Sequence, residues 1–160
     1  MYMTIEMDVK LDTKSLGGFL LYHNYARVAG IFSVLISVAA LVGLILRWDN
    51  WMMTQKVLLG VLALLFTVIQ PLMLLWRGSR RLQSEDYQIP FHYVFSDDGI
   101  VISQGEQQQE FKWQDVRKVV YRKDALYVYM SAVSAFVLPK DQSSGQFDEL
   151  VKMMREHTKK

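Results

Sequence analysis

The chain has 160 residues, 51% of them hydrophobic, and its net charge is only +2. A balance this close to neutral gives no indication of nucleic-acid binding, which needs a strongly basic surface. The sequence contains no cysteine, so disulfides and thiolate metal sites are excluded.

The amino-terminal segment predicts a strand followed by a helix. Between Tyr2 and Asp12, apolar residues at every second position alternate with charged ones. This period of two is typical of a half-buried β-strand, here within residues 1–14, which can add an edge to a later sheet. Residues 15–27 are expected to form an amphipathic lead helix at a membrane interface.

Two long uncharged runs follow, at residues 28–46 and 57–76. At about 1.5 Å per residue, each reaches roughly 28–30 Å as a helix, which matches the hydrocarbon core of a bilayer. A buried hairpin in a soluble protein is the alternative, but a chain of this size would struggle to surround two such helices. We therefore predict a transmembrane hairpin over residues 28–76.

The basic residues near these runs predict an orientation. Only two basic residues, Arg47 and Lys56, lie in the connection between the runs. Six basic residues lie outside the hairpin, three before the first run and three after the second. Because positive loops stay in the cytoplasm, both termini are expected there, in a two-span protein of the inner membrane. The topology signal is strongest in the basic linker 77–88, which carries Arg77, Arg80 and Arg81.

Polar residues within the runs indicate helix packing. Pro71 is expected to bend the second helix, because it removes a backbone donor. Ser33 and Ser37 are four residues apart and form a small-residue face, which fits packing between the two spans or a contact between two copies.

The remaining residues, 89–160, change to short β-like runs separated by turns such as Asp97-Asp98-Gly99. This pattern is typical of an antiparallel sandwich or small barrel. A helix is expected from about Gly145 to His157, because apolar residues there recur at helical spacing, with Ser143 as its cap. The apolar stripe comprises Phe147, Leu150, Val151 and Met154. The predicted fold class is thus α+β: a two-helix transmembrane hairpin plus a pleckstrin-homology-like antiparallel β-barrel or sandwich closed by a C-terminal helix.

Three short motifs carry a resemblance to a known family: Tyr93-x-Phe95 with Asp98-Gly99, Trp113-x-Asp115-Val116, and Ala135-Phe136-x-Leu138-Pro139-Lys140. With the strand and hairpin that precede them, they resemble the YcxB-like family of small bacterial membrane proteins. The resemblance implies a pleckstrin-homology-like cytoplasmic domain. It supplies no activity and no catalytic residues.

The sequence offers no candidate catalytic or metal site. His23, His92 and His157 are scattered and lack a partner at metal-ligand spacing. Nucleophile-elbow, P-loop and dinucleotide motifs are absent. We therefore predict a protein that is not an enzyme and needs no cofactor.

Two binding features remain. Arg117, Lys118, Arg122 and Lys123 can contact anionic lipid headgroups, although a solvated strand pair is favoured because residues 82–160 are net negative. Tyr127 and Tyr129 lie on the face of their strand opposite its aliphatic residues. They are expected either to be covered within the fold, which we favour, or to contact another protein. The predicted function is a cytoplasmic interaction domain for an unknown protein partner or for self-assembly; the alternative is a lipid-binding or membrane-sensing module.

Overall fold

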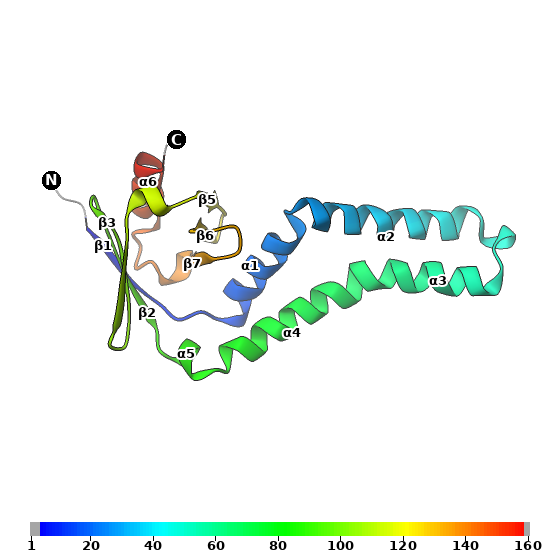
Figure 1. The fold of residues 1–160 in the computed structure, drawn as a ribbon, viewed down its shortest axis with the longest axis horizontal. Coiled ribbons are helices and arrows are strands. Elements are labelled where there is room, and N and C mark those ends of the chain that lie inside the picture. Colours follow the sequence, from blue (N-terminus) through cyan, green and yellow to red (C-terminus); the bar gives the residue numbers. More distant parts are fainter. Residues whose placement is uncertain (1–3, 159–160) are drawn as a thin grey trace. The chain divides into compact units, whose positions relative to one another are not determined.

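The computed structural model describes residues 4–158, and its contacts divide the chain into two compact units (Figure 1). One unit combines Met1–Leu16 with Arg81–Lys160, and the other is the intervening segment Gly17–Arg80. The first two positions of the predicted strand, Tyr2 and Met3, lie outside the described residues. The helical unit is therefore an insertion into the chain of a mostly β unit.

The β unit contains a four-stranded antiparallel sheet in the order β1-β2-β3-β4. β1 pairs with β2 across more than eighty residues of sequence, from Ile5 opposite Phe95 to Val9 opposite Phe91. Apolar residues of β1 are buried and its charged residues are exposed, as its period of two requires. The bounds are β1 (Ile5–Val9), β2 (Phe91–Ser96), β3 (Gly99–Gln104) and β4 (Gln107–Phe111).

A second antiparallel sheet has the order β5-β6-β7. Helix α6 (Phe147–His157) follows it and places four buried side chains in the shared core. The predicted apolar stripe included Val151, but the buried residue is Met153, and Val151 is only partly buried against the core. The strands are β5 (Lys118–Tyr121), β6 (Ala125–Tyr129) and β7 (Ala135–Pro139).

The α+β class and the antiparallel sheets are confirmed. Of the two predicted arrangements, barrel or sandwich, the barrel is wrong, because the described strands form two open sheets. Between β4 and β5 the chain leaves the extended conformation and forms a 3-10 turn, η3 (Trp113–Asp115). The carboxylate of Asp115 accepts a hydrogen bond of 2.9 Å from the backbone N–H of Lys112, which fixes this turn. Trp113 is thereby directed into the core, and the strand ladder is interrupted.

The start of α6 also differs from the prediction. The helix begins at Phe147 rather than near Gly145. The Ser143 hydroxyl donates to the carbonyl of Lys140 at 2.7 Å, so it caps the preceding 3-10 turn, η4 (Lys140–Gln142), and not α6.

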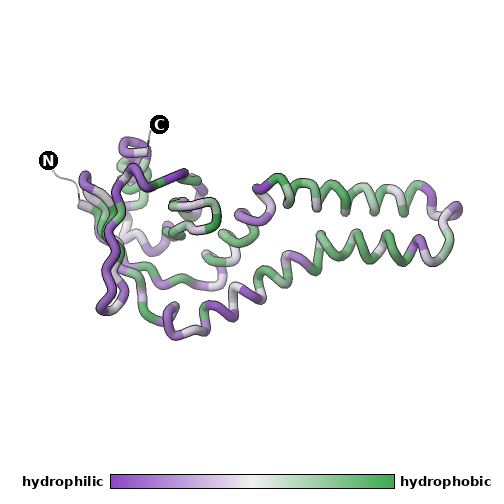
Figure 2. The backbone as a smooth tube through the Cα atoms, viewed as in Figure 1, coloured by the Kyte–Doolittle hydropathy of each residue, from purple (hydrophilic) through white to green (hydrophobic). Residues whose placement is uncertain are grey.

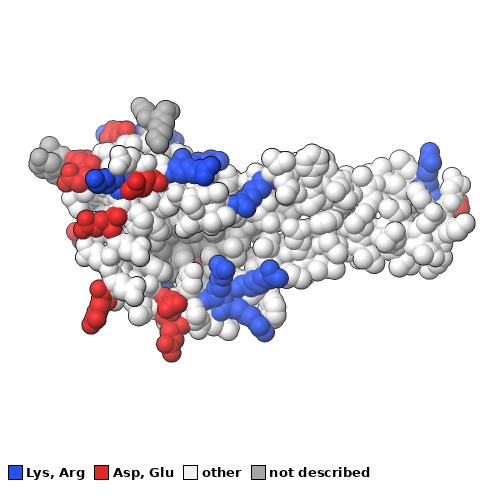
Figure 3. All heavy atoms as spheres, viewed as in Figure 1, with Lys and Arg blue, Asp and Glu red and all other residues white. Residues whose placement is uncertain are grey.

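The helical unit contains two helices that are long and apolar enough to cross a membrane by length and composition. They are Val28–Leu46 and the continuous segment Met53–Leu82. Figure 2 shows the apolar residues along both helices, and on the face in Figure 3 charged side chains are absent from their middle. The bounds are α1 (Thr13–Tyr25), α2 (Val28–Leu46), η1 (Trp48–Asn50), α3 (Met53–Leu64), η2 (Leu65–Ile69), α4 (Gln70–Leu82) and the short α5 (Glu85–Gln88).

Small residues of α2 form the interface with the returning helix. Ser33 and Ser37 are buried, together with Gly30 and Ala40. The Ser37 hydroxyl donates to the carbonyl of Ala63 at 2.6 Å. Of the two uses expected for the small-residue face, the structure thus shows packing between the two helices of one chain.

The bend expected at Pro71 takes the form of a π-helical segment, η2, directly before it. In this segment the N–H of Gln70 bonds to the carbonyl of Leu65, five residues back. In the same register the carbonyl of Phe66 would pair with residue 71, but proline has no N–H. The Tyr25 hydroxyl supplies the missing donor, at 3.0 Å from the Phe66 oxygen.

Candidate functional site

A pocket of about 230 Å³ lies in the β unit, between the four-stranded sheet and β7. Its apolar lining is mostly aromatic, with Tyr87 of α5, Phe91 and Tyr93 of β2, and Phe136 of β7. The aromatic rings contact one another: Phe91 lies 6.3 Å from Tyr93, and Tyr93 meets Phe136 edge to face at 5.9 Å. These contacts give the pocket walls a defined shape.

Two edge strands that do not pair with each other, β4 and β7, both line the pocket. Among the described residues, β4 pairs only with β3, and β7 pairs only with β6. The rings of Phe111 and Phe136 pack at 5.4 Å between these two strands. Gln107, Gln109 and Ala135 line the pocket on the same two strands. Both unpaired edge strands therefore contribute to the pocket wall.

The polar groups of the pocket are neutral. Gln104, Gln107 and Gln109 contribute side-chain amides, and no charged residue lines the pocket. One amide is already engaged, because Gln104 Nε2 donates to the carbonyl of Ile89 at 3.1 Å and also contacts that of Asp86. The remaining amides suit a ligand with amide-like groups, because an ion would be desolvated there without a compensating charge.

Tyr93 is the most deeply buried polar residue of the pocket wall, at 4% exposure. Burial, with a smaller contribution from Tyr87, raises the pKa of the Tyr93 hydroxyl well above its usual value. The hydroxyl is protonated at neutral pH and can donate a hydrogen bond. The hydroxyl oxygen is not among the fully buried unpartnered atoms of the described residues, so it is accessible from the pocket.

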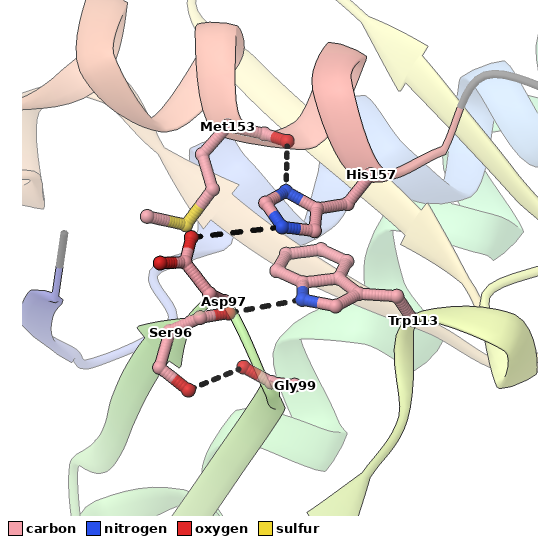
Figure 4. Close-up of polar contacts among 6 residues, drawn as sticks. All are labelled: Ser96, Asp97, Gly99, Trp113, Met153 and His157. Atoms are coloured by element: carbon pink, nitrogen blue, oxygen red, sulfur yellow. Dashed lines mark hydrogen bonds and ion pairs between the residues drawn. The ribbon is translucent and has the colours of Figure 1, made fainter. Parts of the chain in front are cut away.

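A second cluster of side chains joins the end of α6 to the β2–β3 turn (Figure 4). The His157 ring stacks on Trp113 with centroids 4.7 Å apart, and its Nε2 lies 3.6 Å from a carboxylate oxygen of Asp97. The indole N–H of Trp113 donates to the carbonyl of Ser96 at 2.9 Å. The other ring nitrogen of His157 bonds to the Met153 carbonyl at 3.0 Å. Both ring nitrogens are thus engaged, and the cluster fastens the helix.

The basic residues proposed for lipid contact lie at the two ends of β5. Arg117 and Lys118 are at its start, Arg122 and Lys123 follow its end, and all four are exposed. The topology arginines Arg77, Arg80 and Arg81 lie on α4. The guanidinium of Arg80 packs 3.9 Å from the ring centroid of Trp76.

The two tyrosines proposed for protein contact differ in exposure. Tyr127 is only 5% exposed, and Tyr129 is half-buried. Tyr127 therefore offers little surface to a partner. A contact through this strand would have to use Tyr129.

Sequence reasoning did not identify the pocket. Its lining residues come from α5, four strands and the segment before α1. Tyr93, Ala135 and Phe136 belong to the family motifs, but those motifs imply no binding site. The one local signal is the glutamine run Gln107–Gln109, because exposed uncharged residues on an edge strand leave the edge open to pairing. Among residues 4–158 there is also no cluster of three metal-binding side chains.

Comparisons with known proteins support the expected family. A family model described as YcxB-like protein matches residues 95–154, from the end of β2 into α6. The resemblance predicted from the sequence motifs is confirmed for this segment. Searches of curated proteins and of solved structures give no match.

Proposed function

We propose that this YcxB-like chain is a non-enzymatic integral membrane protein that presents an interaction domain to the cytoplasm. The observation that carries the membrane assignment is the exposure of the helical unit. Eleven large apolar side chains of α2 are exposed, and only 22% of its apolar window is buried. The corresponding window of Met53–Leu82 is 6% buried. Water-soluble proteins rarely expose apolar patches beyond a few hundred Å², so a bilayer is the natural environment for these helices.

The distribution of basic residues supports cytoplasmic termini. Arg77, Arg80 and Arg81 lie on α4, at the end of the hairpin that leads into the β unit. The opposite end carries only Arg47 and Lys56. By the positive-inside rule, the β unit then lies in the cytoplasm of a bacterial inner membrane.

The order of elements supports a pleckstrin-homology-like domain. Four antiparallel strands, three further antiparallel strands and one C-terminal helix form the β unit. Fold likeness of this kind does not define an activity. The interaction role draws its support from the pocket, whose aromatic and amide lining suits recognition rather than acid–base chemistry.

Cysteine labelling tests the membrane assignment and the orientation together. The chain has no cysteine, so each introduced thiol reports one position. Asp49→Cys lies in η1 between the spans, and Glu106→Cys lies in the β3–β4 turn. In intact cells we expect an impermeant maleimide to label only Asp49→Cys, with Glu106→Cys labelled after permeabilisation. Extraction of the protein from membranes by alkaline carbonate, or the reverse labelling pattern, would refute the assignment.

The alternative is an anionic-lipid-binding module, and it is favoured by the exposure of Arg117, Lys118, Arg122 and Lys123. Each charge near an anionic surface contributes about 1 kcal/mol. Vesicles with and without phosphatidylserine separate the two functions. Binding that needs the anionic lipid, falls with rising salt and is lost in Lys118→Glu/Lys123→Glu would favour the lipid role.

A further inference from the structure

We propose that the pocket and the adjoining outer edge of β4 bind an uncharged, extended peptide segment of a partner protein. The segment adds to β4 as a further strand and places one large apolar side chain in the pocket. This inference rests on the proposed interaction role and specifies the chemistry of its partner.

The register of β4 identifies the backbone groups available to such a segment. β3 and β4 are joined by a two-residue turn, so the flanking residues Gln104 and Gln107 form a hydrogen-bonded pair. Because such pairs alternate along an antiparallel ladder, the pair that includes Gln108 does not bond to β3. The N–H and C=O of Gln108, and next those of Glu110, therefore point to the open edge. No described backbone group outside β3 bonds to them.

The side chains of β4 place the pocket beside that edge. Gln107 and Gln109 line the pocket, whereas Gln108 points to the other face of the sheet. A strand paired with Gln108 would thus direct alternate side chains towards the pocket. This is the arrangement of peptide recognition by strand addition, in which the backbone gives affinity and a pocket gives specificity.

The pocket has the size and polarity of a site for one side chain. Its volume of about 230 Å³ is below the roughly 300–1,000 Å³ of sites for drug-sized ligands. Aromatic rings form its walls, and no charged residue lines it. A buried ion would meet no counter-charge there, so the inserted side chain is apolar and the segment is neutral where it makes contact.

Tyr93 adds an independent indication of a ligand. Its side chain is 4% exposed and lines the pocket, and its hydroxyl has no partner within the described part of the chain. The Tyr93 oxygen is not among the fully buried side-chain atoms that lack a hydrogen bond, so a ligand in the pocket can reach it. A peptide carbonyl in the pocket would accept a hydrogen bond from this hydroxyl.

Peptide binding by the full-length protein in nanodiscs tests the proposal. The probes are capped pentapeptides, acetyl-Thr-Val-X-Val-Thr-amide, with X as 4-fluorophenylalanine, leucine, glycine or glutamate. Binding is followed by fluorine NMR for the aromatic probe and by its competition for the others, with empty nanodiscs as the control for partitioning into lipid. We expect the aromatic and leucine peptides to bind, and the glycine and glutamate peptides to fail.

Two variants address the two halves of the site. Gln108→Pro removes the outward N–H without removing a bond to β3, and Gln108→Ala is its matched control because it keeps that N–H. We expect Gln108→Pro to weaken binding about two- to twelve-fold, as one lost hydrogen bond predicts, and Gln108→Ala to bind like the wild type. Tyr93→Phe keeps the ring and removes the hydroxyl, and we expect a similar loss.

Each other outcome overturns the proposal. Equal binding of the aromatic and glycine peptides would exclude the pocket. Binding unchanged in Gln108→Pro and in Tyr93→Phe would exclude the edge and the hydroxyl. If acetyl-phenylalanine-amide bound as tightly as the pentapeptide, the pocket would be a small-molecule site. If Gln108→Pro does not fold, peptide binding by Tyr93→Phe still tests the proposal, and unchanged binding would overturn it. Cysteine labelling tests the membrane assignment separately from peptide binding, so the failure of one proposal can be distinguished from the failure of the other.

Discussion

Gly99, from the Asp98-Gly99 motif, has a sharply testable role in the β unit. It begins β3, and the end of β4 runs directly beside it. A Cβ atom at this position would lie 2.3 Å from the carbonyl oxygen of Phe111, whereas real Cβ contacts essentially never fall below 3.0 Å. Gly99→Ala therefore requires the Phe111 carbonyl to move by about 0.7 Å, a shift that disturbs the β3–β4 ladder.

Overpacking of this kind typically costs about 1–3 kcal/mol. For a domain of about 60–100 residues, each 1 kcal/mol lowers Tm by roughly 4–8 °C. Gly105 provides the matched control, because its φ is +57° and no atom lies within 4 Å of a Cβ there. Asparagine tolerates the left-handed conformation, so we expect Gly105→Asn to be nearly neutral and Gly99→Asn to be as damaging as Gly99→Ala.

Urea denaturation of the full-length protein in mild detergent measures both effects. Trp113 is the only tryptophan of the β unit, and it reports on that unit once Trp48, Trp51 and Trp76 are changed to Phe. A Gly99→Ala variant within about 0.5 kcal/mol of the wild type would refute the close approach. Equal losses for Gly99→Asn and Gly105→Asn would show that backbone conformation, rather than contact, is responsible.

Three further predictions follow from single contacts. Tyr25→Phe should lower the stability of the hairpin by about 1–3 kcal/mol. The loss should be much smaller in a Pro71→Ala background, because a backbone N–H at residue 71 can replace the hydroxyl. Steric trapping measures the effect of Tyr25→Phe in each background. His157→Ala should lower the free energy of unfolding by about 0.5–1.5 kcal/mol through lost stacking on Trp113, whereas His157→Phe should retain most of it in the same urea assay; equal losses would contradict stacking. Because the pKa of Tyr93 is raised in the folded state, its contribution is fully present below the unfolded pKa of about 10 and is lost as pH rises above it. Tyr93→Phe should therefore flatten the fall in stability between roughly pH 9 and 11, and an unchanged alkaline slope would refute the assignment.

The sequence alone determined those features that depend on local pattern. The first apolar run, 28–46, coincides with α2, because hydropathy and the absence of charge over nineteen residues suffice to define such a helix. The alternation in the first strand and the helical stripe of Phe147, Leu150 and Met154 are likewise visible in one segment at a time. The family motifs also lie within short stretches, and the match to residues 95–154 agrees with them.

Only the tertiary structure decided which segments meet. The open edge of β4 depends on the 3-10 turn at Trp113, which interrupts a ladder that the apolar pattern would have continued. The pocket joins side chains from strands far apart in the chain, and the position of Tyr93 in its wall follows from that assembly. Tyr25 meets the carbonyl of Phe66 across forty-one residues. Periodicity records which face of an element is apolar, but it does not record which other element covers that face or where the pairing stops, because those outcomes depend on long-range packing.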